Sequence, residues 1–168
     1  MDLFIDTCSW LKLDALSKNN LFLIENLYDF GDINITHDIL FELDHFNCNV
    51  WIKERSKIIP VKNKQVFDEA ITLDFDKADA SLLSNGSKEL ATLIISEDNL
   101  VLRFARMYQF AAIQLIDLIR ILVQQNILSK NELYKINRYL REMRNITLKK
   151  EKEIKQWLAE YRSLQKLA

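Results

Sequence analysis

The chain has 168 residues, nearly half of them hydrophobic, which is enough for one domain with a substantial core. Only two glycines and one proline are present, which argues against a turn-rich β fold and against flexible linkers. Because the N-terminus shows neither a basic stretch nor a long apolar run, we expect no signal peptide, no membrane span and a cytoplasmic location. The two cysteines, Cys8 and Cys48, are too few for a disulfide framework and are expected to be free thiols.

Short apolar runs alternate with longer helical periods along the first 125 residues. In chain order the pattern predicts a strand at 3–5, helices at 8–17 and 20–29, a strand at 33–35, a helix at 37–46, a strand at 58–61, helices at 63–72 and 76–88, a strand at 93–95, a helix at 97–108, a strand at 111–113 and a helix at 115–125. Strands that alternate with helices pair in parallel and carry helices on both faces. We therefore expect an α/β domain at 1–125 with four or five parallel strands.

Residues 126–168 have a different pattern and are predicted to form a C-terminal helical extension. Ser129 and Glu132 have the spacing of a capping box, which marks the start of a helix. Two apolar stripes follow, at Leu133, Ile136, Leu140 and Met143 and then at Ile154, Trp157, Tyr161, Leu164 and Ala168. We interpret them as a helical hairpin that packs on the body or on a partner, and such paired helices would suit a homodimer.

Charge is unevenly distributed between these two parts. Residues 130–168 hold eleven Lys or Arg and five Asp or Glu, whereas residues 1–129 hold twelve and nineteen. A basic extension could contact a polyanion and an acidic body could hold a metal, although a solvated helical face is favoured if the charge distribution is the only evidence.

Four acids fall where a parallel sheet gathers its functional groups. Ligands bind outside the carboxyl ends of the strands, where Asp6 follows the first predicted strand and Asp98 the fourth. Glu42 and Asp79 lie on helices that can reach the same edge. Clustered carboxylates repel one another unless a cation neutralises them, and Mg²⁺ and Mn²⁺ prefer such oxygen ligands. Phosphodiester hydrolysis at a metal fits this set better than nucleotide binding, because no glycine-rich phosphate loop is present.

Four segments together resemble the PIN-domain nucleases, a family that includes the toxins of many toxin–antitoxin pairs: Phe4-Ile5-Asp6-Thr7, the run from Ile33 to Leu43, Ala78-Asp79-Ala80-Ser81, and Ile94-Ile95-Ser96-Glu97-Asp98. The resemblance covers about residues 2–125, and the tail is similar to that of a subgroup with a helical extension. It implies a three-layer PIN-like fold and a Mg²⁺- or Mn²⁺-dependent endoribonuclease. Its partners would be RNA and, for a toxin, an antitoxin protein.

The resemblance also assigns roles to particular residues. It implies that Asp6, Glu42, Asp79 and Asp98 are the catalytic and metal-binding acids, and Ser96 supplies the hydroxyl of the last motif. Asp76 and Glu97 compete with Asp79 and Asp98 for two of these assignments. Arg103 and Arg106, one to two helical turns beyond Asp98, could hold substrate phosphates, since a guanidinium pairs bidentately with phosphate oxygens. Ordinary exposed charge on a helix is an equally good interpretation of both.

Other interpretations remain open at this level. Each acid on its own could be a helix cap or a first-turn residue. Asp38, Glu42 and His45 share one helical face, but no second histidine has the spacing of a zinc site, so a solvated face is favoured. A phosphatase with Asp6 as nucleophile is disfavoured because Cys8 stands where a second aspartate is expected. The main alternative function is a catalytically weak PIN-like module that binds RNA or protein.

Overall fold

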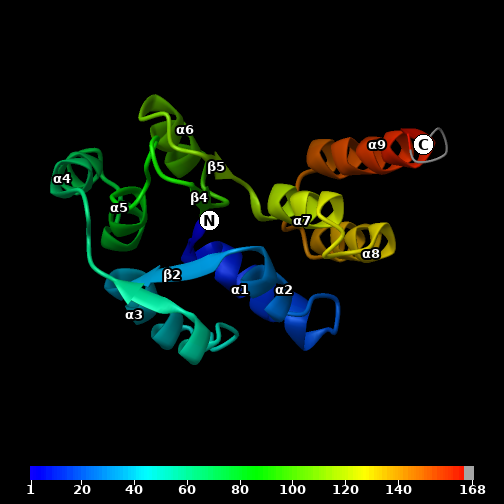
Figure 1. Ribbon diagram of the computed structural model, residues 1–168, viewed down its shortest axis with the longest axis horizontal. Helices are drawn as coiled ribbons and strands as arrows, with labels where there is room; N and C mark the ends of the chain where they lie inside the picture. The colour runs from blue at the N-terminus through cyan, green and yellow to red at the C-terminus, as the bar shows by residue number, and fades with distance from the viewer. Residues whose placement is uncertain (165–168) are drawn as a thin grey trace.

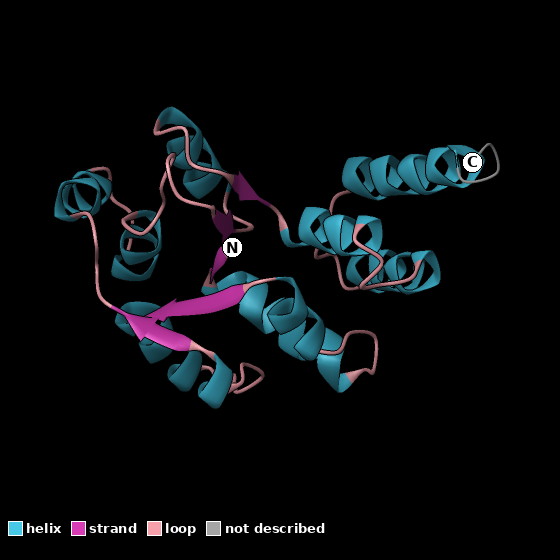
Figure 2. Ribbon diagram, viewed as in Figure 1, coloured by secondary structure: helices cyan, strands magenta, loops and turns pink. Residues whose placement is uncertain are grey.

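Five parallel strands form the centre of the molecule. The computed structural model describes the backbone of residues 1–164 and the side chains of residues 1–161. The sheet has the order β3-β2-β1-β4-β5, and its strands are β1 (Asp2–Ile5), β2 (Asp32–Thr36), β3 (Lys57–Ile59), β4 (Thr92–Ile95) and β5 (Ala112–Ile113). Every pairing is parallel (Figures 1 and 2). The predicted α/β fold with a parallel sheet is confirmed.

Helices cover both faces of this sheet because successive strand residues point to opposite sides. Leu3 and Ile5 of β1 join one apolar cluster, whereas Phe4 between them joins the other. The first cluster contains residues of α1 (Thr7–Lys18), α2 (Glu25–Phe30), α3 (His37–His45) and α7 (Leu115–Gln124), and the second contains residues of α4 (Lys64–Thr72), α5 (Lys77–Leu83) and α6 (Asn99–Met107). A short 3₁₀ helix, η1 (Lys53–Arg55), precedes β3.

The predicted helix at 20–29 is shorter in the structure, where α2 begins only at Glu25. Asn20 adopts a left-handed conformation with φ of 54°, and the N–H of Leu21 donates back to the carbonyl of Leu16. This arrangement ends α1 in the way that many helices end, and it turns the chain before a new helix can form. Phe22 and Ile24 therefore lie in the loop before α2, and their side chains are buried.

The predicted helix at 76–88 is also shorter, since α5 ends at Leu83. Ser84 Oγ and Asn85 Nδ2 both donate to the carbonyl of Ser81, at 2.7 and 2.9 Å. Such side chains compete with the next helical N–H groups for the same acceptors, which stops the helix.

The C-terminal hairpin is present as α8 (Lys130–Glu142) and α9 (Leu148–Leu164), which pack against each other. Ser129 and Glu132 form the predicted capping box in both directions. Of the second predicted stripe, Leu164 and Ala168 lie outside the described side chains. Within the described residues, no helix is both long and apolar enough to cross a membrane.

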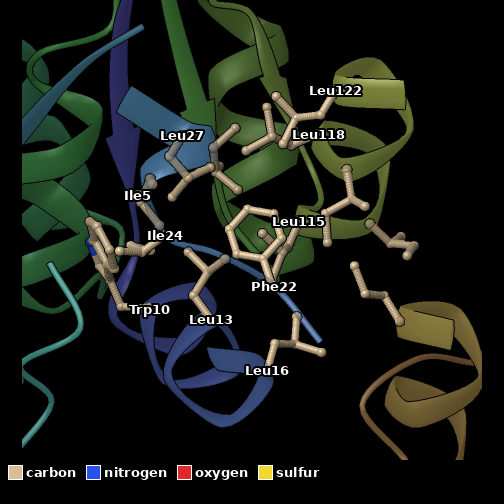
Figure 3. Packing of buried hydrophobic residues seen from close by; sticks show 14 of the residues in the cluster. Ile5, Trp10, Leu13, Leu16, Phe22, Ile24, Leu27, Leu115, Leu118 and Leu122 are labelled. Carbon is tan, nitrogen blue, oxygen red and sulfur yellow. The ribbon is translucent and has the colours of Figure 1, made fainter. Parts of the chain in front are cut away.

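The hairpin continues the core of the body through α7. Leu133, Ile136 and Ile154 belong to the same cluster as Leu3 of β1. Figure 3 shows how α7 packs on the rest of the body: Leu115, Leu118 and Leu122 of α7 face Leu13, Leu16 and Phe22. The hairpin is thus attached by continuous apolar packing; the division of the chain at residue 125 stays a prediction.

Candidate active site

Asp6 is the most buried of the four acids, and both of its carboxylate oxygens accept backbone hydrogen bonds. It directly follows β1, caps α1 and is only 4% exposed. Its Oδ1 accepts from the N–H of Ser9 at 2.6 Å, and its Oδ2 accepts from the N–H of Glu97 at 3.0 Å. Each carboxylate oxygen can accept more than one partner, so both retain a free acceptor site. Asp6 therefore joins the ends of β1 and β4 and can still act as a ligand.

Asp98 reaches the same edge of the sheet from β4, which lies beside β1 with Ile5 opposite Ile95. Asp98 caps α6 by accepting from the N–H of Leu100 at 2.6 Å, and its carboxylate is exposed. Ser96 is fully buried, and its Oγ accepts from the N–H of Asp98 at 3.0 Å. The Ser96 hydroxyl thus holds the backbone of Asp98 in place.

Glu97, the alternative to Asp98 as the acid of this segment, already has partners within the chain. Its Oε2 lies 2.6 Å from Lys12 Nζ, and its Oε1 accepts from the N–H of Leu115 at 3.0 Å. Both side chains of this ion pair are about 15% exposed (14% for Lys12 and 15% for Glu97). The Glu97 side chain therefore ties α1 to the start of α7, which leaves Asp98 as the open carboxylate of this segment.

Glu42 projects from α3, which follows β2. Thr7, the first residue of α1, donates a hydrogen bond from Oγ1 to Glu42 Oε2. Thr36 begins α3 by capping it, and its hydroxyl lies 2.6 Å from Ser81 Oγ of α5. Hydroxyl groups thus connect α1, α3 and α5 around the acids.

The carboxyl group of Asp79 is influenced by the negative charges of the other acids. It lies in the first turn of α5, whose N-cap is Asp76. Burial raises the pKa of Asp79 to about 7, and the negative charges of its neighbours contribute in the order Asp76, Asp6, Asp98 and Glu42. Each of the predicted acids is therefore close enough to act electrostatically on Asp79. Asp79 is half-buried and is influenced by Asp6, Asp98 and Glu42 as well as by Asp76, so it is the better candidate of the two.

The arrangement fits a hard divalent cation in its chemistry. All four donors are carboxylates, and none of the four forms an ion pair with Lys, Arg or His in the described part of the chain. Among the described residues, no three His, Cys, Asp or Glu side chains form a ready-made metal-binding group. Mg²⁺ commonly binds through one or two carboxylates and keeps several waters, so its binding does not need such a group.

Comparison with protein-family models, curated protein sequences and solved structures finds no match.

Several predicted residues lie away from the acids or on the surface. Arg103 and Arg106 are exposed on α6 beside its buried residues Phe104 and Ala105, and neither has an ion pair among the described residues. His37 and His45 are exposed at the two ends of α3, and the His45 ring meets Phe46 edge-on. The structure thus gives the histidines no shared metal-binding position.

Sequence reasoning missed the groups that surround the acids. Cys8 lies two residues after Asp6, and partial burial, followed by the charge of Asp6, raises the pKa of its thiol. Thr7 could have been noticed, because it directly follows Asp6 and begins a helix. Nothing in the sequence around Lys12 indicated its ion pair, because its partner Glu97 comes much later in the chain.

Proposed function

We propose that this protein is a divalent-metal-dependent ribonuclease whose site consists of Asp6, Glu42, Asp79 and Asp98. The observation that carries the proposal is the convergence of these acids at the carboxyl edge of the sheet. Three of them raise the pKa of the fourth, Asp79. Unneutralised carboxylates destabilise a fold, so an arrangement that holds them together is best explained by a cation that binds there.

The residues have separable roles in this proposal. Asp6 and Asp98 follow the adjacent parallel strands β1 and β4 and would hold Mg²⁺ or Mn²⁺, with Glu42 and Asp79 completing the charge around it. A bound ion would supply positive charge to the phosphate and make an attacking water more acidic. Thr7 fixes Glu42, and Ser96 fixes the backbone of Asp98. Hydrogen bonds within the protein thus fix the Glu42 carboxylate and the backbone at Asp98.

RNA as the substrate class is supported by two features. The four acidic segments resemble the PIN-domain nucleases, and the five-stranded parallel α/β fold agrees with what that resemblance implies. Basic residues are also concentrated in the tail that follows the domain. A role as the toxin of a toxin–antitoxin pair, with an antitoxin partner, remains a prediction from the resemblance.

Cleavage of a mixed RNA by the purified chain tests the proposal, with Mg²⁺ or Mn²⁺ and with a chelator. The informative variant is Asp98→Asn, because asparagine caps a helix as well as aspartate does and the fold should survive. We expect cleavage only with metal, and a loss on the order of 100-fold in the variant. Asp68→Asn, which removes one exposed charge from α4, is the matched control. Cleavage that persists in chelator, or that Asp98→Asn leaves intact, would contradict the proposal.

RNA binding without cleavage is the second candidate. It is favoured by the lack of a compact group of three metal-binding side chains among the described residues. In that case the chain should bind RNA with equal affinity with and without Mg²⁺, and neither metal nor time should produce fragments. The same assay therefore separates the two functions.

A further inference from the structure

A pocket of about 590 Å³ opens beside the acids, between the body and the α8–α9 turn. Cys8 and Lys12 of α1 line one side of it, and Glu97 and Asn99 line the edge near β4. The turn contributes Arg144 and its neighbours to the opposite side. The turn of the C-terminal hairpin thus forms part of the wall of a cavity that is also lined by chain neighbours of Asp98.

The pocket is adjacent to the carboxylates through its own lining residues. Cys8 is two residues from Asp6. Glu97 and Asn99 are the two chain neighbours of Asp98. A strand of nucleic acid with one phosphate at the acids would therefore extend naturally into this pocket.

The wall of the pocket is fixed by the body. Lys12 Nζ donates to Glu97 Oε2 at 2.6 Å and to the carbonyl of Asn145 at 2.8 Å. The N–H of Asn145 donates to the carbonyl of Leu140 at 2.7 Å, and Ile146 is buried in the core. One lysine therefore joins the active-site edge of the sheet to the α8–α9 turn, and the pocket is preorganised.

The cations around the pocket differ in what they already bind. Lys12 is paired with Glu97, and Lys150 lies 2.8 Å from Asp117 and 3.4 Å from Glu153. Arg144 is exposed and forms no ion pair within the described part of the chain. Arg144 is thus the pocket cation that remains available for an incoming anion.

We propose that Arg144 binds a backbone phosphate of the RNA strand in this pocket and so positions the strand relative to the acids. A guanidinium pairs bidentately with phosphate oxygens, and the neighbouring side chains of Asn99, Gln114 and Asn145 offer hydrogen bonds to ribose or base edges. This inference rests on the proposed function for the identity of the strand. It gives the C-terminal hairpin a direct part in substrate binding.

The other tail arginines provide matched controls. Arg138 pairs with Glu142 at 2.7 Å, and Arg141 lies 3.3 Å from Glu151. Neither lines the pocket. Arg138→Gln therefore removes the same charge from the same hairpin as Arg144→Gln, without changing the proposed site.

The test is the affinity for a short single-stranded RNA, measured by fluorescence anisotropy in a chelator at several salt concentrations. Without metal the strand stays intact, so binding is read independently of cleavage. Arg144→Gln should weaken binding about fivefold to tenfold and should lower the salt slope by about 0.7, the contribution of one phosphate contact on a single strand. Arg138→Gln should retain the wild-type affinity within about twofold and a slope closer to that of the wild type.

The outcomes separate this inference from the proposed function. If Arg144→Gln and Arg138→Gln bind RNA with equal affinity and equal salt slope, or if the wild type binds no RNA, the inference is overturned. Metal-dependent cleavage by the wild type together with equal affinities would refute only the role of Arg144. Selective loss of RNA affinity in Arg144→Gln, with no cleavage by the wild type, would support the pocket and refute the nuclease.

Discussion

The acids at the sheet edge differ from the charged residues in and around the C-terminal hairpin in whether they have ion-pair partners. In and around the hairpin, carboxylates face cations: Asp117 lies 2.8 Å from Lys150, and Glu151 lies 3.3 Å from Arg141. At the sheet edge, the carboxylates of Asp6 and Asp98 accept backbone N–H groups and have no ion pair in the described structure. Several charges of the hairpin are therefore paired with charges of the body or of the neighbouring helix, whereas Asp6 and Asp98 have no cationic partner among the described residues.

Lys12 lies between these two regions, and its replacement should have the largest effect on stability. Lys12→Met leaves Glu97 largely buried without its cation and detaches the Asn145 carbonyl from the body. We expect a loss of about 2–4 kcal/mol in the free energy of unfolding, measured by urea denaturation. Adding Glu97→Gln to Lys12→Met should restore part of the loss. A loss in the double variant at least as large as in the single variant would show that the ion pair is not what holds the turn.

Replacement of Asp79 should increase the free energy of unfolding, whereas replacement of Lys12 should decrease it. The pKa of Asp79 is raised from 3.8 to about 7, so the folded state favours the protonated acid. Stability from this group is therefore fully present below about pH 4 and is lost as the pH rises through about 7. Asp79→Asn should gain about 1–2 kcal/mol over the wild type near pH 8, after allowance for solvent screening, and nothing near pH 4.

Thermal unfolding of wild type and Asp79→Asn across this pH range checks the sign. Asp68→Asn, on the exposed surface of α4, should show no such pH-dependent gain. If Asp79→Asn were destabilising at every pH, the carboxylate would be a structural group and the comparison between the two regions would fail.

The smallest effect is expected for an exposed pair in the hairpin. Arg138 and Glu142 are 70% and 58% exposed, so water screens their attraction. Glu142→Gln should leave the midpoint of thermal unfolding unchanged within the error of the measurement. A clear fall in the midpoint would show that the surface charges of the hairpin contribute to stability as the buried ones do.

The parts of this molecule that follow local rules could be predicted from the sequence. Short apolar runs placed all five strands, and the Ser129–Glu132 spacing placed the start of α8. The position of acids directly after strands also indicated that Asp6 and Asp98 share one edge, because parallel strands end on the same side.

The remaining features depend on contacts between distant segments. Lys12 and the carbonyl of Asn145 are 133 residues apart, and no periodicity connects them. The predicted ends of some helices were also wrong. Side chains such as Ser84 and Asn85 donate to a helix carbonyl and end the helix early. The pocket beside the acids was not predictable for the same reason, since its walls come from both ends of the chain.

The central claim is that the carboxylates at the sheet edge bind a divalent cation, and metal titration followed by thermal unfolding tests it most directly. A ligand that binds only the folded state stabilises it by mass action, by about 2.7 kcal/mol at about 100 times its Kd. We predict that Mn²⁺ raises the midpoint of the wild type and of Asp68→Asn, and that Asp6→Asn and Asp98→Asn lose most of this increase. An equal increase in all four proteins would contradict a metal site at these acids.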